Sequence, residues 1–304
     1  MRASRRAMLR YGAAAGVSLL LPACRPAPAP RPHTQTSLRE GALRLELRHF
    51  ISNGDERFAL ARIRFEPSWP GPNKGSPDAP DWGDYRLSLF DPAGGALIFR
   101  AGFDSNLDRN AASAATQISM RIPLPERAVD AVIERRRTGR VFHTLWNGPI
   151  DPGAEAIDRS SSAMRTRVDT MLSNGEPAAK ADIAILGDGY VESQYGKFVA
   201  DARRACDYLF SVDPFRKRVQ DFNVRAVFVP SPESGVTDPY LGLQKSTVFR
   251  CAYSAGDSER TLAVGDDTAL REAASAVPYD FLLVIANARR YGGSAYFGGP
   301  AVVS

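Results

Sequence analysis

Three polar loops in the C-terminal half of the chain carry residue types that could do chemistry. They are GDGY (187–190), SPESG (231–235) and YGGSAYFGG (291–299), and each follows an apolar run typical of a buried strand. In an open α/β sheet, ligands bind outside the carboxyl ends of the strands. If the three strands are neighbours, we expect the loops to converge on one cleft.

The candidate cleft residues all come from these loops. They are Asp188, Gly189, Tyr190, Glu233, Ser234, Tyr291, Gly292 and Gly293. Each has a simpler interpretation, since Asp188 could cap the following helix and Glu233 could be an ordinary surface residue. The four glycines of the last loop, Gly292, Gly293, Gly298 and Gly299, could serve only to permit positive φ. A glycosidase pair of Asp188 and Glu233 stays open, because the sequence does not fix their separation.

The positions of the histidines exclude several kinds of hydrolase site. His33, His49 and His143 all precede the C-terminal half, so that half cannot hold a Ser–His–acid triad. Ser294 lacks the second glycine of a nucleophile elbow, and Cys206 has no histidine partner in this half. No H-E-x-x-H zinc motif occurs, so we assign neither catalytic nor metal-binding residues.

The elements that must position these loops differ between the two halves. Residues 39–153 contain short alternating runs, such as LRLELRHF and YRLSLF, which predict a β-sandwich. From residue 154 onward, continuous apolar runs at 181–186, 222–229 and 281–286 alternate with helical patterns near 192–210 and 266–277. This order predicts an α/β domain with a mainly parallel sheet over residues 154–304.

The start of the chain predicts export rather than nucleic-acid binding. Six arginines and no acidic residues precede residue 38, so the rest of the chain is nearly neutral despite a formal net charge of +5. SRRAMLR (4–10) matches a twin-arginine signal, and LPAC ends at Cys24, a candidate lipidation site. A plain signal peptide with an incidental cysteine is the alternative. We expect a signal peptide at 1–24, a Pro-rich tether at 25–38, and a membrane-anchored lipoprotein in the periplasm or on the cell surface.

Several separated motifs carry a resemblance to a known family. ADIAILGDGYVESQYGKFVADA, DPFRKRVQDFNVRAVFVPSPESGVTDP and YDFLLVIANARRYGG resemble the catalytic domain of the IgA-peptidase family of zinc metalloendopeptidases. RHFISNGDERFALARI, GFDSN and VFHTLWNGPIDP resemble that family's N-terminal β-sandwich domain. The resemblance implies an α+β two-domain fold, a β-sandwich followed by an α/β zinc-peptidase-like domain.

The same resemblance implies zinc chemistry on a peptide or protein substrate. In that family a helix after the glycine-rich loop carries H-E-x-x-H, whose histidines bind zinc while the glutamate polarises a water. The printed chain stops before any such motif, so we expect an incomplete catalytic domain that binds no zinc and is inactive. The eight loop residues above would line the substrate cleft. The alternative is a non-catalytic surface lipoprotein that binds a glycan or protein through its β-sandwich. Whether Cys206 and Cys251 pair is left open.

Overall fold

The structure is a computed structural model that describes residues 38–304 except 70, 72–81, 108–110, 139–140 and 255–257. The predicted signal peptide, the lipidation site at Cys24 and all of the tether except its last residue lie outside the described residues. Within the described part of the chain, no helix is both long and apolar enough to span a membrane.

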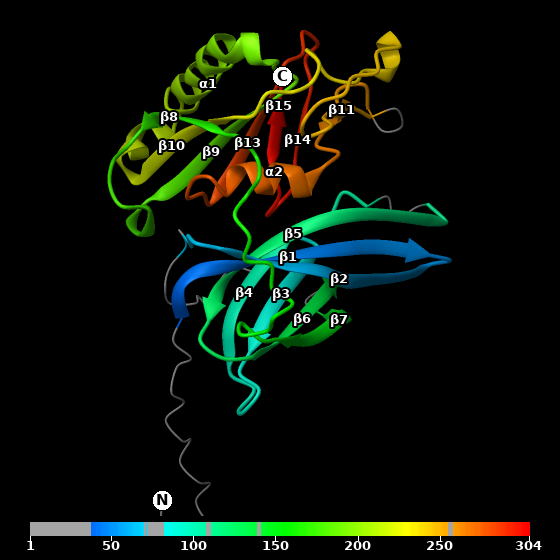
Figure 1. Cartoon of the computed structure of the whole chain (residues 1–304). Coiled ribbons are helices and arrows are strands. Elements are labelled where there is room, and N and C mark those ends of the chain that lie inside the picture. Colours follow the sequence, from blue (N-terminus) through cyan, green and yellow to red (C-terminus); the bar gives the residue numbers. More distant parts are fainter. Residues whose placement is uncertain (1–37, 70, 72–81, 108–110, 139–140, 255–257) are drawn as a thin grey trace, which may run out of the picture. The chain divides into compact units, whose positions relative to one another are not determined.

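The N-terminal domain consists of two antiparallel sheets (Figure 1). The three-stranded sheet has the order β2–β1–β5 and the four-stranded sheet has the order β4–β3–β6–β7. The strands are β1 (Leu38–Ser52), β2 (Asp55–Glu66), β3 (Tyr85–Phe90), β4 (Leu97–Phe103), β5 (Ser113–Pro125), β6 (Val129–Arg136) and β7 (Phe142–Ile150). In the three-stranded sheet, β5 is an edge strand.

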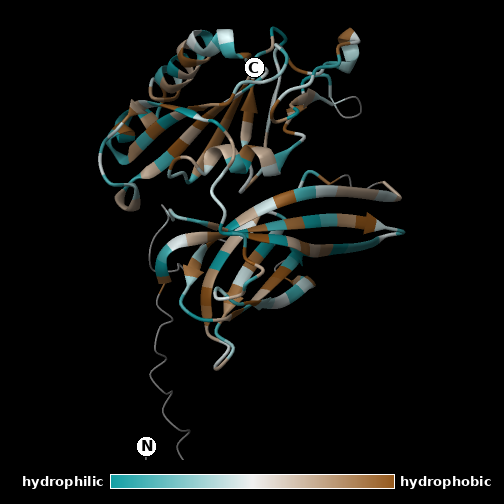
Figure 2. Cartoon of the chain, in the orientation of Figure 1, coloured by the Kyte–Doolittle hydropathy of each residue, from teal (hydrophilic) through white to brown (hydrophobic). Residues whose placement is uncertain are grey.

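One core joins these two sheets. Leu43, Leu45 and Leu47 alternate along β1 and pack with Leu87 of β3 and Ile133 of β6. Figure 2 shows the matching alternation of hydrophobic and hydrophilic residues along the strands. Because every second side chain is buried, hydrophobic and polar residues alternate along these strands. The prediction of a β-rich N-terminal region is confirmed.

The C-terminal domain contains a six-stranded sheet with the order β14–β15–β13–β9–β10–β8. The four inner strands are parallel, and the two edge strands pair antiparallel with their neighbours. The strands are β8 (Arg167–Leu172), β9 (Ala181–Asp188), β10 (Phe222–Phe228), β13 (Phe281–Ala286), β14 (Gly293–Ala295) and β15 (Ala301–Val303). The three predicted strands are thus adjacent, with β9 between β10 and β13.

Both faces of this sheet are covered, which explains the continuous apolar runs. Along β9, Ile183 and Ile185 belong to one core cluster, whereas Ala184 and Leu186 belong to another. Helix α1 (Tyr195–Leu209) packs on the first cluster and helix α2 (Asp267–Ala274) on the second. Asp266 caps α2 by accepting a hydrogen bond from the Ala269 N–H at 2.9 Å.

The remaining elements are short. They are the strand pair β11 (Ala252–Tyr253) and β12 (Leu262–Ala263), and the 3₁₀ helices η1 (Pro177–Ala179), η2 (Glu192–Gln194), η3 (Phe215–Asp221) and η4 (Pro239–Leu241). Cys206 and Cys251 are both buried free thiols. They belong to different core clusters, so the structure does not pair them.

Candidate functional site

Asp188 ends strand β9, and its side chain is fully buried. Its Oδ1 accepts the Phe249 N–H at 2.9 Å. Its Oδ2 accepts the Cys251 N–H at 2.8 Å and the Thr247 hydroxyl at 2.7 Å. The carboxylate therefore fixes the segment 247–251 against the end of the sheet. It does not act as the N-cap of the following helix.

The loops after β9 and β10 meet at two glycines. Gly189 adopts φ +75°, and a Cβ atom there would lie 2.3 Å from the Gly235 carbonyl oxygen. The Gly235 N–H donates to the Gly189 carbonyl at 2.9 Å. Only glycine allows both the positive φ and this close approach. The sequence interpretation of positive φ concerned the glycines of the 291–299 loop, and it is correct for Gly298 but not for Gly292, Gly293 and Gly299.

Tyr190 lies inside the domain rather than on a cleft surface. Its ring is buried against Phe198, and its hydroxyl donates to Asp201 Oδ2 at 2.7 Å. Burial raises the pKa of this phenol well above its ordinary value, and the neighbouring Asp201 carboxylate adds to the effect. Its hydroxyl thus holds α1 to the end of β9.

Glu233 and Ser234 are exposed at the same edge of the sheet. Glu233 Oε2 accepts the Ser246 N–H at 2.6 Å, and Ser234 Oγ accepts from Asn287 Nδ2 at 3.2 Å. Asn287 also donates to the Gly189 carbonyl at 2.8 Å, so it links the loops that follow all three strands. Sequence reasoning missed Asn287, although its position directly after β13 could have indicated it.

The glycine-rich segment takes a different path. Gly292 packs against the Tyr253 ring, and the Gly293 N–H donates to the Arg260 carbonyl at 2.9 Å. Tyr291 is 75% exposed and lies under the Arg260 guanidinium. The structure therefore brings the Asp188–Tyr190 loop together with Glu233 and Ser234. It places Tyr291–Gly293 against Tyr253 and Arg260.

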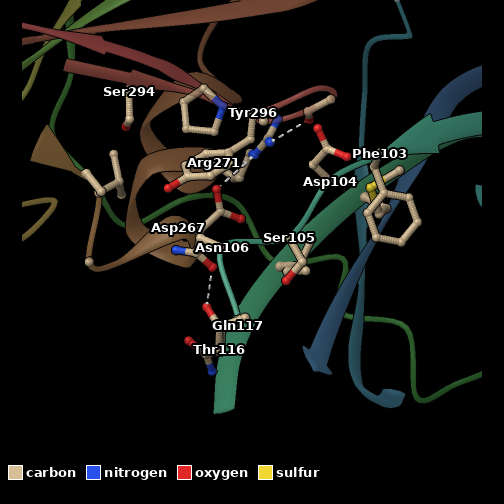
Figure 3. A pocket seen from close by; sticks show the side chains of 18 of the residues that line it. Phe103, Asp104, Ser105, Asn106, Thr116, Gln117, Asp267, Arg271, Ser294 and Tyr296 are labelled. Atoms are coloured by element: carbon tan, nitrogen blue, oxygen red, sulfur yellow. Dashed lines mark hydrogen bonds and ion pairs between the residues drawn. The ribbon is translucent and has the colours of Figure 1, made fainter. Parts of the chain in front are cut away.

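A separate cavity of about 540 Å³ lies between residues of both domains (Figure 3). Its lining comes from β1, the 103–106 segment and β5 on one side, and from α2, the 263–265 segment and residues 294–302 on the other. None of the eight predicted cleft residues lines it. Ser294 does, and its hydroxyl donates to the Leu262 carbonyl at 2.7 Å. This hydroxyl is used to hold β14 to β12.

The charged side chains of this cavity are mostly paired. Arg271 is buried and lies 3.3 Å from Asp267 Oδ1, while Asp267 Oδ2 accepts the Ser119 N–H at 3.0 Å. Asp104 accepts the Asp84 N–H at 2.8 Å. Arg48 is exposed and forms no ion pair with another described residue. Two arginines and two aspartates thus line the cavity, and Arg48 contributes an exposed positive charge that no described carboxylate pairs.

The described residues do not supply a zinc donor set. No group of three His, Cys, Asp or Glu side chains in that part of the chain is close enough to hold a metal. His49 is buried between Ser105 Oγ at 2.7 Å and Glu56 Oε1 at 3.0 Å, so both of its nitrogens are used. We assign no metal ligand to the described residues.

Comparison with known families gives two matches. Residues 170–304 match the family IgA Peptidase M64, and residues 35–147 match the family Peptidase M64 N-terminus. The matches follow each other in the order expected for an N-terminal domain and a peptidase domain. No curated protein matches the sequence.

Proposed function

Because this chain belongs to the IgA peptidase M64 family of metallopeptidases, we propose that the protein serves in the hydrolysis of peptide bonds. The supporting observation is that both family matches coincide with the two domains, and that loops from three adjacent parallel strands meet at one edge of the sheet. That edge is where α/β proteins bind ligands. The substrate class is a peptide or protein.

Within this proposal, β1–β7 form the β-sandwich of the family and β8–β15 form part of its zinc-peptidase domain. Glu233, Ser234 and Tyr291 are exposed and would contact the substrate directly. Asp188, Gly189, Tyr190, Gly292 and Gly293 would act by holding the loops in place. This division follows from the buried hydrogen bonds of Asp188 and Tyr190.

Zinc is the metal that the family implies, and the described residues do not fit it. We therefore derive no catalytic step through a metal here. The proposal is that residues 38–304 alone bind no catalytic zinc and hydrolyse no peptide. A catalytic metal site of the family's kind would need ligands from outside residues 38–304.

The test begins with that coding sequence. An in-frame His-Glu-x-x-His within a few dozen codons supports the peptidase, and its absence from every frame overturns it in favour of a non-catalytic binding lipoprotein. The protein from the extended frame is then assayed on a quenched fluorescent casein, with and without a zinc chelator. Chain 38–304 is the matched control, and stoichiometric zinc in that control would also contradict the proposal.

We further propose that the protein is exported and anchored to a membrane through a lipid on Cys24. The support is the twin-arginine pattern at Arg5 and Arg6 followed by Leu21–Cys24. A Cys24→Ala variant should move from the membrane fraction to the soluble exported fraction. An Arg5→Lys, Arg6→Lys double variant should block export. Unchanged fractionation of both variants would contradict this location.

A further inference from the structure

In the described part of the chain, β5 is an outer strand whose backbone edge borders the cavity between the domains. It is the outer strand of the order β2–β1–β5. The Ser119 N–H donates to Asp267 Oδ2 at 3.0 Å, so it points away from β1. In a regular antiparallel pair this direction repeats every second residue. The pairing of β1 with β5 is regular from Ser113 to Pro123.

The backbone groups of Ala115 and Gln117 therefore also point away from β1. The hydrogen bond from the Asn53 N–H to the Ala112 carbonyl supports this alternation, because Ala112 has the opposite parity and faces β1. Among the described residues, no backbone hydrogen bond outside the β1–β5 pairing uses Ala115 or Gln117. Both residues are exposed, and both line the cavity.

The cavity has the size and shape for an added strand at this edge. Figure 3 shows β5 running along it, with Thr116 and Gln117 on one side and Ser294 and Tyr296 on the other. Its volume of about 540 Å³ lies within the range of about 300–1,000 Å³ found for ligand sites. An unpaired strand edge binds extended peptide through main-chain hydrogen bonds.

The positive charge of Arg48 indicates which kind of peptide would bind here. Arg48 of β1 lies directly opposite Gln117 in the pairing of β1 with β5, on the same face of the sheet. Arg48 forms no ion pair with another described residue, whereas Arg271 and Asp267 in the same cavity pair with each other. The other carboxylate of the lining, Asp104, accepts the backbone N–H groups of Asp84 and Phe297. An added strand would lie two strand spacings, about 9–10 Å, from β1. The long Arg48 side chain could reach across Gln117 to a carboxylate on that strand, which would supply an ionic partner.

We propose that this cavity binds an extended acidic peptide segment, which pairs with the β5 edge at Ala115–Gln117 and places a carboxylate against Arg48. This inference rests on the proposed function, because the segment would belong to the protein substrate. The site is separate from the Asp188–Ser234 loop cluster, so it would hold substrate at a distance from the loops. Specificity would then depend partly on the N-terminal domain.

The experiment measures binding to chain 38–304 by fluorescence polarisation, and so needs no hydrolysis. The probe is a labelled, capped hexapeptide, Thr-Val-Glu-Val-Thr-Val, with a matched peptide that carries Gln in place of Glu. The Glu peptide should bind more tightly. Arg48→Gln should weaken it about tenfold, the loss of one charge-assisted hydrogen bond, and should leave the Gln peptide unchanged. Arg57→Gln, at an exposed ion pair on β2, is the matched control and should change neither.

Strand pairing has a second signature. Peptides that are N-methylated at alternate positions should differ, because only every second peptide N–H bonds to β5. The proposal is overturned if the affinity changes neither with N-methylation nor with Arg48→Gln, or if no saturable binding is observed. Peptide binding without a zinc motif after Ser304 would refute the proposed function alone. Hydrolysis by the extended protein with a KM unaffected by Arg48→Gln would refute the acidic peptide site alone.

Discussion

Glu272 of helix α2 lies 3.0 Å from Nη2 of Arg44 on strand β1, so a buried ion pair joins the two domains. Arg44 is fully buried and also contacts Glu66 and Glu46, while Arg64 lies 2.7 Å from the same Glu272 oxygen. Burial opposes the charge of Arg44, but the neighbouring glutamates outweigh it and raise the pKa of the guanidinium. Arg44 therefore keeps its charge where the domains meet.

Glu272→Gln should destabilise the protein by about 2–3 kcal/mol, because Arg44 and Arg64 both lose a buried carboxylate partner. The measurement is the urea midpoint of unfolding at neutral pH. Asp55→Asn is the control, since it breaks the exposed pair with Arg57 and should cost less than about 1 kcal/mol. Equal losses for the two variants would show that the Glu272 cluster does not join the domains energetically.

The strands whose hydrophobic pattern follows from burial could be predicted from the sequence. Alternation along β1 and the continuous run of β9 correspond to one covered face and two covered faces, respectively. Because β10, β9 and β13 are adjacent, the loops after β9 and β10 meet each other and Asn287. The glycine-rich segment after Asn287 does not join them, since Gly292 and Gly293 lie against Tyr253 and Arg260. Edge strand β8 was not predicted, because RVDTML mixes three polar with three apolar residues and none of its residues is buried.

The roles of individual site residues could not be predicted in the same way. Asp188 was selected because it follows a strand, yet its oxygens are used by Thr247, Phe249 and Cys251, about 60 residues further along the chain. Loop partners at such separations leave no periodic signal in the sequence. The cavity at β5 was missed for a related reason, since its two walls come from different domains.

Asp188→Asn should loosen the segment 247–251 rather than alter a surface contact. The asparagine side chain has one acceptor oxygen instead of two, so its NH₂ group would face the N–H of Phe249 or Cys251, and that N–H would lose its acceptor. We expect the free energy of unfolding to fall by about 2–4 kcal/mol. Amide hydrogen exchange at these two residues should accelerate together with the fall in Tm. Glu233→Gln, at an exposed site, is the comparison and should leave both measurements nearly unchanged. An Asp188→Asn protein with wild-type exchange would mean that the carboxylate has no structural role.

Glu56 should make the N-terminal domain sensitive to acid. Burial favours its neutral form, but the hydrogen bond from Tyr85 at 2.6 Å and the charge of Arg135 outweigh burial and lower the pKa of this carboxyl. The folded state therefore binds the Glu56 proton more weakly than the unfolded state. Its contribution to stability is present above the unfolded pKa of about 4.5 and is lost as pH falls below it.

Glu56→Gln should consequently lower stability at pH 7 and flatten the decline of the urea midpoint between about pH 5 and pH 3. The control is Glu40→Gln on the exposed start of β1, which should keep the wild-type acid profile. A Glu56→Gln profile parallel to that of the wild type would contradict the role of Glu56 in acid unfolding.

Cys206 and Cys251 should remain reduced and slow to react in the folded protein. Burial raises the pKa of both thiols, and for Cys251 the nearby Asp188 carboxylate adds to the rise, so little thiolate is present at neutral pH. Because they lie in different core clusters, a disulfide would require the sheet to be disrupted. A Cys24→Ala chain isolated without reductant should react slowly with Ellman's reagent when native and yield two thiols per chain in guanidinium. A disulfide-linked Cys206–Cys251 peptide in a non-reducing digest of the native protein would refute the placement of the two cysteines in different core clusters.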